Sequence, residues 1–143
     1  MFRFVRLFTA FALTGAVIGC TSFVPTQVSS FVDDDGNKLV VEYGRGSEKH
    51  ASTFVSLTGK EMEYKSDLGI NMQLPDGKVV TAWRCMNAEL PGTMYMSPDR
   101  RWKCLVTGIS SMLFLYDEAV NDYALVFQGS MTDTRRIGKD AKQ

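Results

Sequence analysis

The sequence predicts an all-β protein, a small antiparallel β-barrel or β-sandwich with one disulfide, after an N-terminal signal peptide. Two observations lead to this fold class. Short apolar and β-branched stretches recur along the chain, and most neighbours are separated by a few polar residues that include glycine, proline or aspartate. Few segments show the apolar period of an amphipathic helix. Short strands with turn signals between them are typical of antiparallel barrels and sandwiches.

The strand candidates form pairs in chain order, each joined by a turn. Segment 33–37 contains the Asp-Gly signal of a β-hairpin, and segment 75–77 is a proline-initiated turn that ends in glycine. The predicted pairs are 27–32 with 38–43, 53–57 with 61–65, 70–74 with 78–86, 93–96 with 102–107, and 112–116 with 123–128.

Alternation of apolar and polar residues predicts which side chains face inward. In segment 61–65, Met62 and Tyr64 are expected to face the core, and the charged residues between them to face water. Segments 112–116 and 124–127 are apolar on both faces, so we expect them to lie centrally or against a partner.

Four regions are expected along the chain. Residues 1–19 have the composition of a signal peptide, and 20–27 form a short tether. Residues 28–129 form the antiparallel β domain. Residues 130–143 are polar and charged without apolar periodicity, which predicts a flexible tail.

The N-terminal signal is predicted from its length and flanks. Arg3 and Arg6 precede an apolar run over residues 7–18. The run is too short to cross a membrane as a helix, which needs roughly 20 residues. A basic start, a short apolar run and a small residue at its end are typical of a secretory signal.

The run ends in Val17-Ile18-Gly19-Cys20, which resembles the lipobox of bacterial lipoproteins. The resemblance implies cleavage after Gly19, a thioether-linked diacylglycerol on Cys20 and an N-acyl chain such as palmitate on the new amino terminus. Thr21 stands where an aspartate would retain a lipoprotein in the inner membrane. The resemblance therefore implies an outer-membrane anchor that faces the periplasm in a Gram-negative cell. The alternatives are an ordinary signal peptide or a short buried helix, in which Cys20 is an unmodified thiol.

The charge balance argues against nucleic acid as a partner. The chain has 16 basic and 16 acidic residues. When Arg3 and Arg6 are removed with the signal, 14 basic residues remain against 16 acidic ones, a formal charge of −2. Nucleic-acid binding depends on a basic surplus, which is missing here.

Cys85 and Cys104 form an even pair in a chain expected to reach an oxidising compartment, which predicts a disulfide. A bridge of this loop length would stabilise the fold by roughly 3 kcal/mol. The alternative is two buried free thiols. Both cysteines stand in the same pattern of Trp, basic residue and Cys, starting at Trp83 and Trp102.

Residues two apart on a strand share a face, so each tryptophan should lie beside its cysteine. The simple interpretation is a disulfide flanked by two tryptophans inside the core. The alternative is an aromatic binding surface beside the disulfide. The residues of this candidate binding surface are Trp83, Trp102, Arg100, Arg101 and Tyr95.

No motif predicts catalysis, a metal or a cofactor other than the lipid on Cys20. His50 is the single histidine, and no nucleophile motif accompanies it. One histidine and two paired cysteines do not make a zinc site. The acidic segment 33–37 fails the calcium-loop pattern, because glycine and glutamate are missing at its sixth and twelfth positions.

These observations predict a non-enzymatic binding or accessory subunit of an envelope protein assembly. One alternative is an inhibitor of an attacking enzyme, similar in size, anchor and fold class to the periplasmic inhibitors of c-type lysozyme. The Ser-Gly-x-x-Tyr loop of that family is not found, and segment 91–95 is a poor match to it. The other alternative is a carrier of a small apolar ligand in a barrel mouth.

Overall fold

A computed structural model describes residues 23–55, 58–85 and 91–137 of the chain. The predicted signal peptide, the lipobox with Cys20 and residues 138–143 of the predicted tail lie outside the described residues. Within the described ranges, no helix has the length and apolar character needed to cross a membrane.

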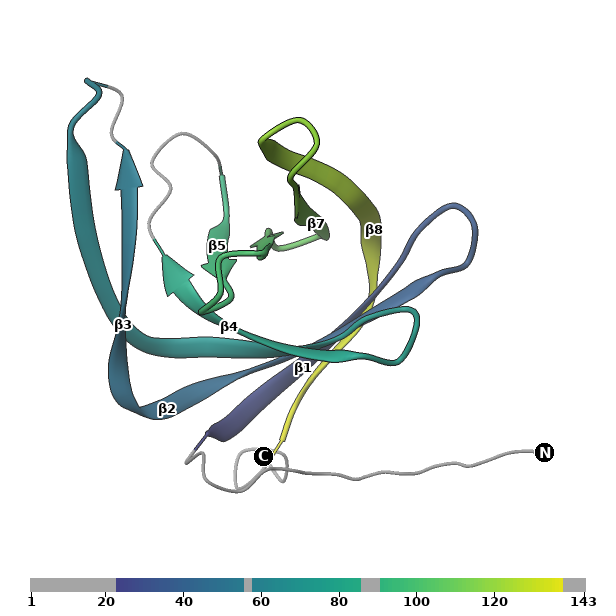
Figure 1. The fold of residues 1–143 in the computed structure, drawn as a ribbon. Helices are drawn as coiled ribbons and strands as arrows, with labels where there is room; N and C mark the ends of the chain where they lie inside the picture. The colour runs from purple at the N-terminus through teal and green to yellow at the C-terminus, as the bar shows by residue number, and fades with distance from the viewer. Residues whose placement is uncertain (1–22, 56–57, 86–90, 138–143) are drawn as a thin grey trace.

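The described chain is an all-β structure of eight antiparallel strands in one ring-like sheet (Figure 1). Consecutive strands pair with each other, and β1 also pairs with β8, which closes the sheet on itself. The strands are β1 (Val24–Val32), β2 (Lys38–Val55), β3 (Glu61–Gln73), β4 (Val79–Cys85), β5 (Thr93–Met96), β6 (Trp102–Val106), β7 (Ser110–Asp117) and β8 (Asp122–Arg136).

The predicted stretches merge where the chain bends without leaving the sheet. Segment 38–43 and residues 53–55 both belong to β2, and segment 61–65 and residues 70–73 both belong to β3. Residues 56 and 57 of the second predicted strand lie outside the described residues. The residues between them, which are polar and rich in glycine, continue the β2–β3 pairing through a large irregularity between Arg45 and His50. Glycines and polar residues are typical of a loop, but here they form a bulge that bends a long hairpin.

Both ends of the predicted domain are corrected by the structure. β1 begins at Val24, inside the predicted tether. Residues 130–136, predicted as part of a flexible tail, belong to β8 and pair with β1 to close the ring. Backbone pairing holds this segment although it carries few apolar side chains. We call this β1–β8 pairing, from Gln27–Val32 to Ser130–Arg136, the seam. The hydroxyls of Ser29 and Thr134 add a hydrogen bond across it at 2.9 Å.

The main core fills the inside of the ring. Its members alternate along each strand, so they point to the same face of the closed sheet. Met62 is an exception to the predicted pattern, because 43% of it is exposed in the part of β3 beyond the bend. The inner cluster consists of Phe31, Leu39, Val41, Ile70, Met72, Leu74, Ala82, Tyr95, Cys104, Val106, Leu113 and Phe127.

A second apolar cluster lies on the opposite face of β4 to β7. Its buried members are Cys85, Met94 and Leu105, which are neighbours across three strands. Met112 continues the same row on β7. Because strand residues alternate between faces, this row points away from the inner cluster that contains Cys104.

The structure does not contain the predicted disulfide: Cys85 and Cys104 are free, buried thiols. Cys85 pairs with Met94 on β5, whereas Cys104 pairs with Tyr95 on the same strand. The cysteines therefore lie two strands apart and on opposite faces. Two strand spacings separate Cα atoms by roughly 10 Å, whereas a disulfide needs about 4–7 Å.

We expect both thiols to remain reduced in the folded protein. Burial raises the pKa of Cys85 to about 11 and that of Cys104 to about 12, which suppresses the reactive thiolate. Alkylation after denaturation without reductant should label both cysteines, and dithiothreitol should leave the urea midpoint unchanged. Labelling that required prior reduction would restore the disulfide and overturn this register.

Candidate functional site

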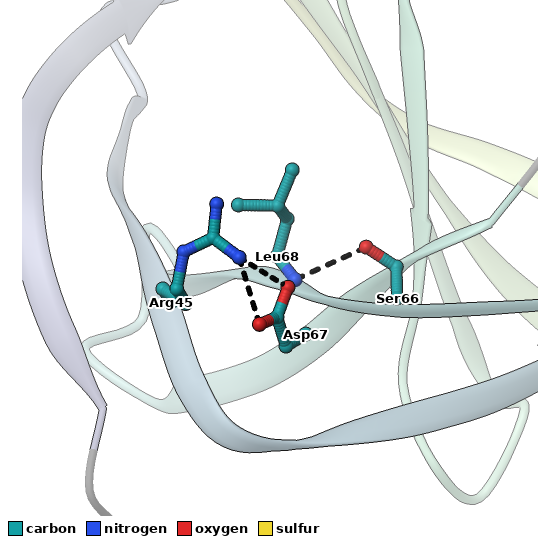
Figure 2. A network of polar contacts seen from close by, with 4 residues as sticks. All are labelled: Arg45, Ser66, Asp67 and Leu68. Atoms are coloured by element: carbon teal, nitrogen blue, oxygen red, sulfur yellow. Dashed lines mark hydrogen bonds and ion pairs between the residues drawn. The ribbon is translucent and has the colours of Figure 1, made fainter.

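The site is built at the bend of the β2–β3 hairpin. The guanidinium Nη1 of Arg45 contacts both carboxylate oxygens of Asp67, at 2.6 and 2.7 Å, across the bend (Figure 2). This arginine lowers the pKa of the Asp67 carboxyl, chiefly through the hydrogen bond. Beside it the backbone N–H of Leu68 donates to Ser66 Oγ at 3.1 Å. The ion pair joins β2 to β3 at the bend, and it is exposed, because 60% of the Arg45 side chain is accessible to solvent.

The bend brings His50 onto Trp83. The two rings stack with their centroids 3.8 Å apart and their planes 10° from parallel. Phe23 makes an edge contact with the same indole at 6.2 Å between centroids. Trp83 lies on the face of β4 opposite Ala82, which belongs to the inner cluster. The stack is therefore an aromatic group on the outer face of the ring, although Trp83 is only 9% exposed.

Glycines make room for this indole. A Cβ on Gly46 would lie 2.6 Å from Trp83 Cη2, and one on Gly69 would lie 2.5 Å from Trp83 Cε3. The second position is the more restrictive, because its Cβ would also meet the backbone oxygen of Ala82 at 2.8 Å. Glycines inside a strand often mark such a close approach.

Gly69→Ala should destabilise the fold by about 1–3 kcal/mol through overpacking against Trp83. The measurement is urea unfolding, with near-ultraviolet circular dichroism to follow the tryptophan environment. Gly108→Ala is the matched control, because a Cβ there meets nothing within 4 Å. Equal stability of the two variants would show that the indole moves aside without cost.

A small hollow opens beside the stack. It has a volume of about 150 Å³, room for roughly five waters at about 30 Å³ each. Its lining residues include a histidine, a tryptophan, a methionine and an arginine, and no acidic residue is among the described residues that line it. Such a lining suits one acidic or aromatic side chain. The lining residues are His50, Ala51, Ser52, Trp83, Met96, Ser97, Pro98 and Arg100.

The turn between β5 and β6 holds Arg100 in place. Ser97 Oγ donates to Asp99 at 2.6 Å and accepts from the backbone N–H of Trp102 at 3.0 Å. The hydrogen bond from Ser97 lowers the pKa of Asp99, so this carboxyl stays charged. Arg100 itself has a φ of 65°, and Tyr123 Oη donates to its carbonyl at 2.5 Å. A left-handed non-glycine residue costs about 1–3 kcal/mol, and such strain concentrates at functional sites.

The five residues of the predicted surface are not all together. Trp83 and Arg100 line the same hollow. Arg101 is exposed but lines a separate hollow with residues of β7 and β8. Trp102 packs against the inner cluster and Tyr95 belongs to it, where burial raises the tyrosine pKa to about 12.

The predicted pairing of each tryptophan with its cysteine on one face agrees with strand alternation. Trp83 shares the outer face with Cys85, and Trp102 shares the inner face with Cys104. The two pairs therefore lie on opposite faces. The expected core of two tryptophans around a disulfide is not formed.

The chain matches no protein-family model, no curated protein and no solved structure. Among residues 23–55, 58–85 and 91–137, no group of three or more His, Cys, Asp or Glu side chains is placed to hold a metal ion.

Sequence reasoning missed His50 as a binding residue, because it tested that side chain only as a catalyst or a ligand. Gly44, Gly46 and Gly69 carried the missing signal. Added Cβ atoms at these positions would meet Val24 or Trp83 below 3 Å. Several glycines within β-branched or aromatic stretches indicate that something bulky approaches the backbone. The sequence does not reveal which aromatic residue that is.

Proposed function

We propose that this chain is a lipid-anchored protein of the bacterial envelope that binds another envelope protein as a non-enzymatic accessory subunit. The observation that carries the binding role is the hollow beside the His50–Trp83 stack, with Arg100 at its wall. Of the two predicted folds, we take the ring-like sheet to be the β-barrel. The anchor rests on the lipobox resemblance at Cys20, with the periplasmic face of the outer membrane as the expected address.

The hollow has the properties of an anchor point for a single partner side chain. Its walls are set by secondary structure on β2, β4 and the β5–β6 turn, so little ordering is required on binding. Tryptophan and arginine are the residues most enriched among those that dominate binding energy at interfaces. The cationic Arg100 favours an acidic side chain, and the indole favours an aromatic one.

The interior of the ring supports a carrier role less well. The side chains of Phe31, Leu39, Ile70, Met72 and Leu113 fill it and are at most 1% exposed. An apolar ligand would have to displace this packing. The inhibitor interpretation stays a prediction from size and anchor.

The binding role is tested by crosslinking in the native membrane, followed by affinity purification and mass spectrometry. We expect one envelope protein in near-stoichiometric amount. Arg100→Glu should lower its recovery at least about tenfold, the effect of losing an interface hot spot. Arg101→Glu is the matched control, because it changes the same charge on the same turn but lies outside the hollow. Equal recovery with both variants, or a lone monomer with the wild-type chain, would contradict the proposal.

The lipid anchor has a separate test. Growth with a radiolabelled or alkyne-tagged palmitate should label the wild-type protein and not Cys20→Ser. The labelled protein should float with outer membranes in a density gradient. A protein that is exported and soluble after cleavage, without label, would show an ordinary signal peptide instead.

A further inference from the structure

Strand β8 extends beyond β1, the strand with which it closes the ring. β1 pairs with β8 from Val32 opposite Ser130 to Gln27 opposite Arg136. The first half of β8, residues 122–129, pairs with β7 on one side. No strand of the described residues pairs with its other side. In Figure 1 the β1–β2 hairpin points to the right, away from this upper part of β8.

This half of β8 is therefore an open sheet edge. The N–H of Met131 donates to the carbonyl of Ile109 on the β7 side, at 2.8 Å. Backbone groups alternate sides along a strand, so those of Gln128 face the open side. Eight residues span about 26 Å. Proteins normally cover or blunt such an edge, because it is a template for another strand.

A hollow of about 550 Å³ lies along the edge. Leu125 and Val126 line it and are 49% and 50% exposed. Val126 is the extra residue of the irregularity in the β7–β8 register, between Leu113 opposite Phe127 and Phe114 opposite Leu125. A bulge of this kind redirects side chains and is common beside functional sites. The edge thus offers apolar contact as well as backbone groups.

One end of the hollow is acidic. Among the described residues that line it, the charged ones are Asp33, Asp34 and Asp35 of the β1–β2 turn. Asp33 accepts hydrogen bonds from Asn37 Nδ2 and from the backbone N–H groups of Asp35 and Asn37. The side-chain bond from Asn37 contributes most to lowering the Asp33 pKa. Asp34 and Asp35 are exposed.

We propose that residues 122–129 of β8 bind an extended segment of a partner protein as an added strand, with a lysine or arginine of that segment against Asp34 and Asp35. The partner segment carries apolar side chains at alternate positions, which contact Leu125 and Val126. Main-chain hydrogen bonds supply affinity in this mode, and side chains supply specificity. The acidic turn selects a basic residue by charge complementarity. This surface is separate from the His50–Trp83 hollow and does not depend on the lipid anchor.

The test selects nine-residue peptides from a random displayed library against the purified full chain in detergent. Selected peptides should combine alternate apolar residues with a lysine or arginine near one end. Their binding should slow hydrogen exchange of amides in 122–129. N-methylation of the peptide residues that face β8 should abolish binding, and N-methylation of the intervening residues should preserve it.

Charge variants separate this surface from a general electrostatic attraction. The double change Asp34→Lys and Asp35→Lys should weaken the selected peptide at least tenfold at low salt. Glu63→Lys, an exposed carboxylate on β3, should change affinity less than twofold. The proposal is overturned if no peptide is selected, if protection falls elsewhere, or if both charge changes act equally. Pairing of β8 with β8 in a dimer, detected by analytical ultracentrifugation, would also overturn it.

Discussion

A chain that ends at Gly129 should lose its cooperative fold. The truncation removes the residues of β8 that pair with β1, including Met131, which packs against the inner cluster. It also removes Thr134, the hydrogen-bond partner of the buried Ser29 hydroxyl. The loss of this hydrogen bond costs about 1 kcal/mol, in addition to the lost core contacts.

Urea unfolding and 8-anilinonaphthalene sulfonate fluorescence measure this outcome. The truncated chain should bind the dye and unfold without a sharp transition, as loosely packed β proteins do. A chain that ends at Ile137 is the control, because it keeps every described residue of the seam. Sharp unfolding of the Gly129 chain at the wild-type midpoint would mean that the ring is stable while open.

Phe31→Ala should destabilise the fold by about 3–5 kcal/mol, the usual cost of removing a buried phenylalanine. Phe31 is 0% exposed and pairs with Leu39 on one side and Met131 on the other. It therefore packs where the ring closes. Small domains are stable by only about 5–15 kcal/mol, so this change removes a large share of the total.

The measurement is the free energy of unfolding from urea titration at fixed pH. Val79→Ala serves as the control, because Val79 is 63% exposed and should change stability by less than about 0.5 kcal/mol. A loss below about 1 kcal/mol for Phe31→Ala would show that the cavity collapses, or that the seam contributes little.

The all-β class and most strands follow from alternation and turn chemistry. The Asp-Gly turn between β1 and β2 and the Pro-Asp-Gly turn between β3 and β4 are present as predicted. Local patterns failed where tertiary pairing decides. Segment 44–50 is strand because β3 pairs with both ends of it, and residues 130–136 are strand because β1 lies beside them.

The candidate site was predicted only in part, because its geometry also depends on how distant strands pair. Alternation places each tryptophan beside its cysteine, but the register between strands decides which face that is. Across β5, Trp83 aligns with Met96 and then with Lys103, not with Trp102. This displacement by one residue puts Trp83 on the outer face and Trp102 on the inner face. A single sequence contains no signal of cross-strand register at this point. His50 reaches Trp83 only because of the bulge in β2.

We also expect the ring closure to influence the order of folding. In the described part of the chain, seven of the eight strand pairings join consecutive strands, so each can form as a local hairpin. The remaining pairing joins Ser29 to Thr134, 105 positions apart. Bringing such distant segments together costs about 4 kcal/mol of chain entropy.

We therefore expect the seam to form late in refolding. Substitutions there, Phe31→Ala included, should accelerate unfolding more than they slow folding. Before closure, the side of β1 that faces away from β2 is an open edge, and the second half of β8 has no partner strand. Refolding yield should then fall with protein concentration, because these open edges can pair between chains.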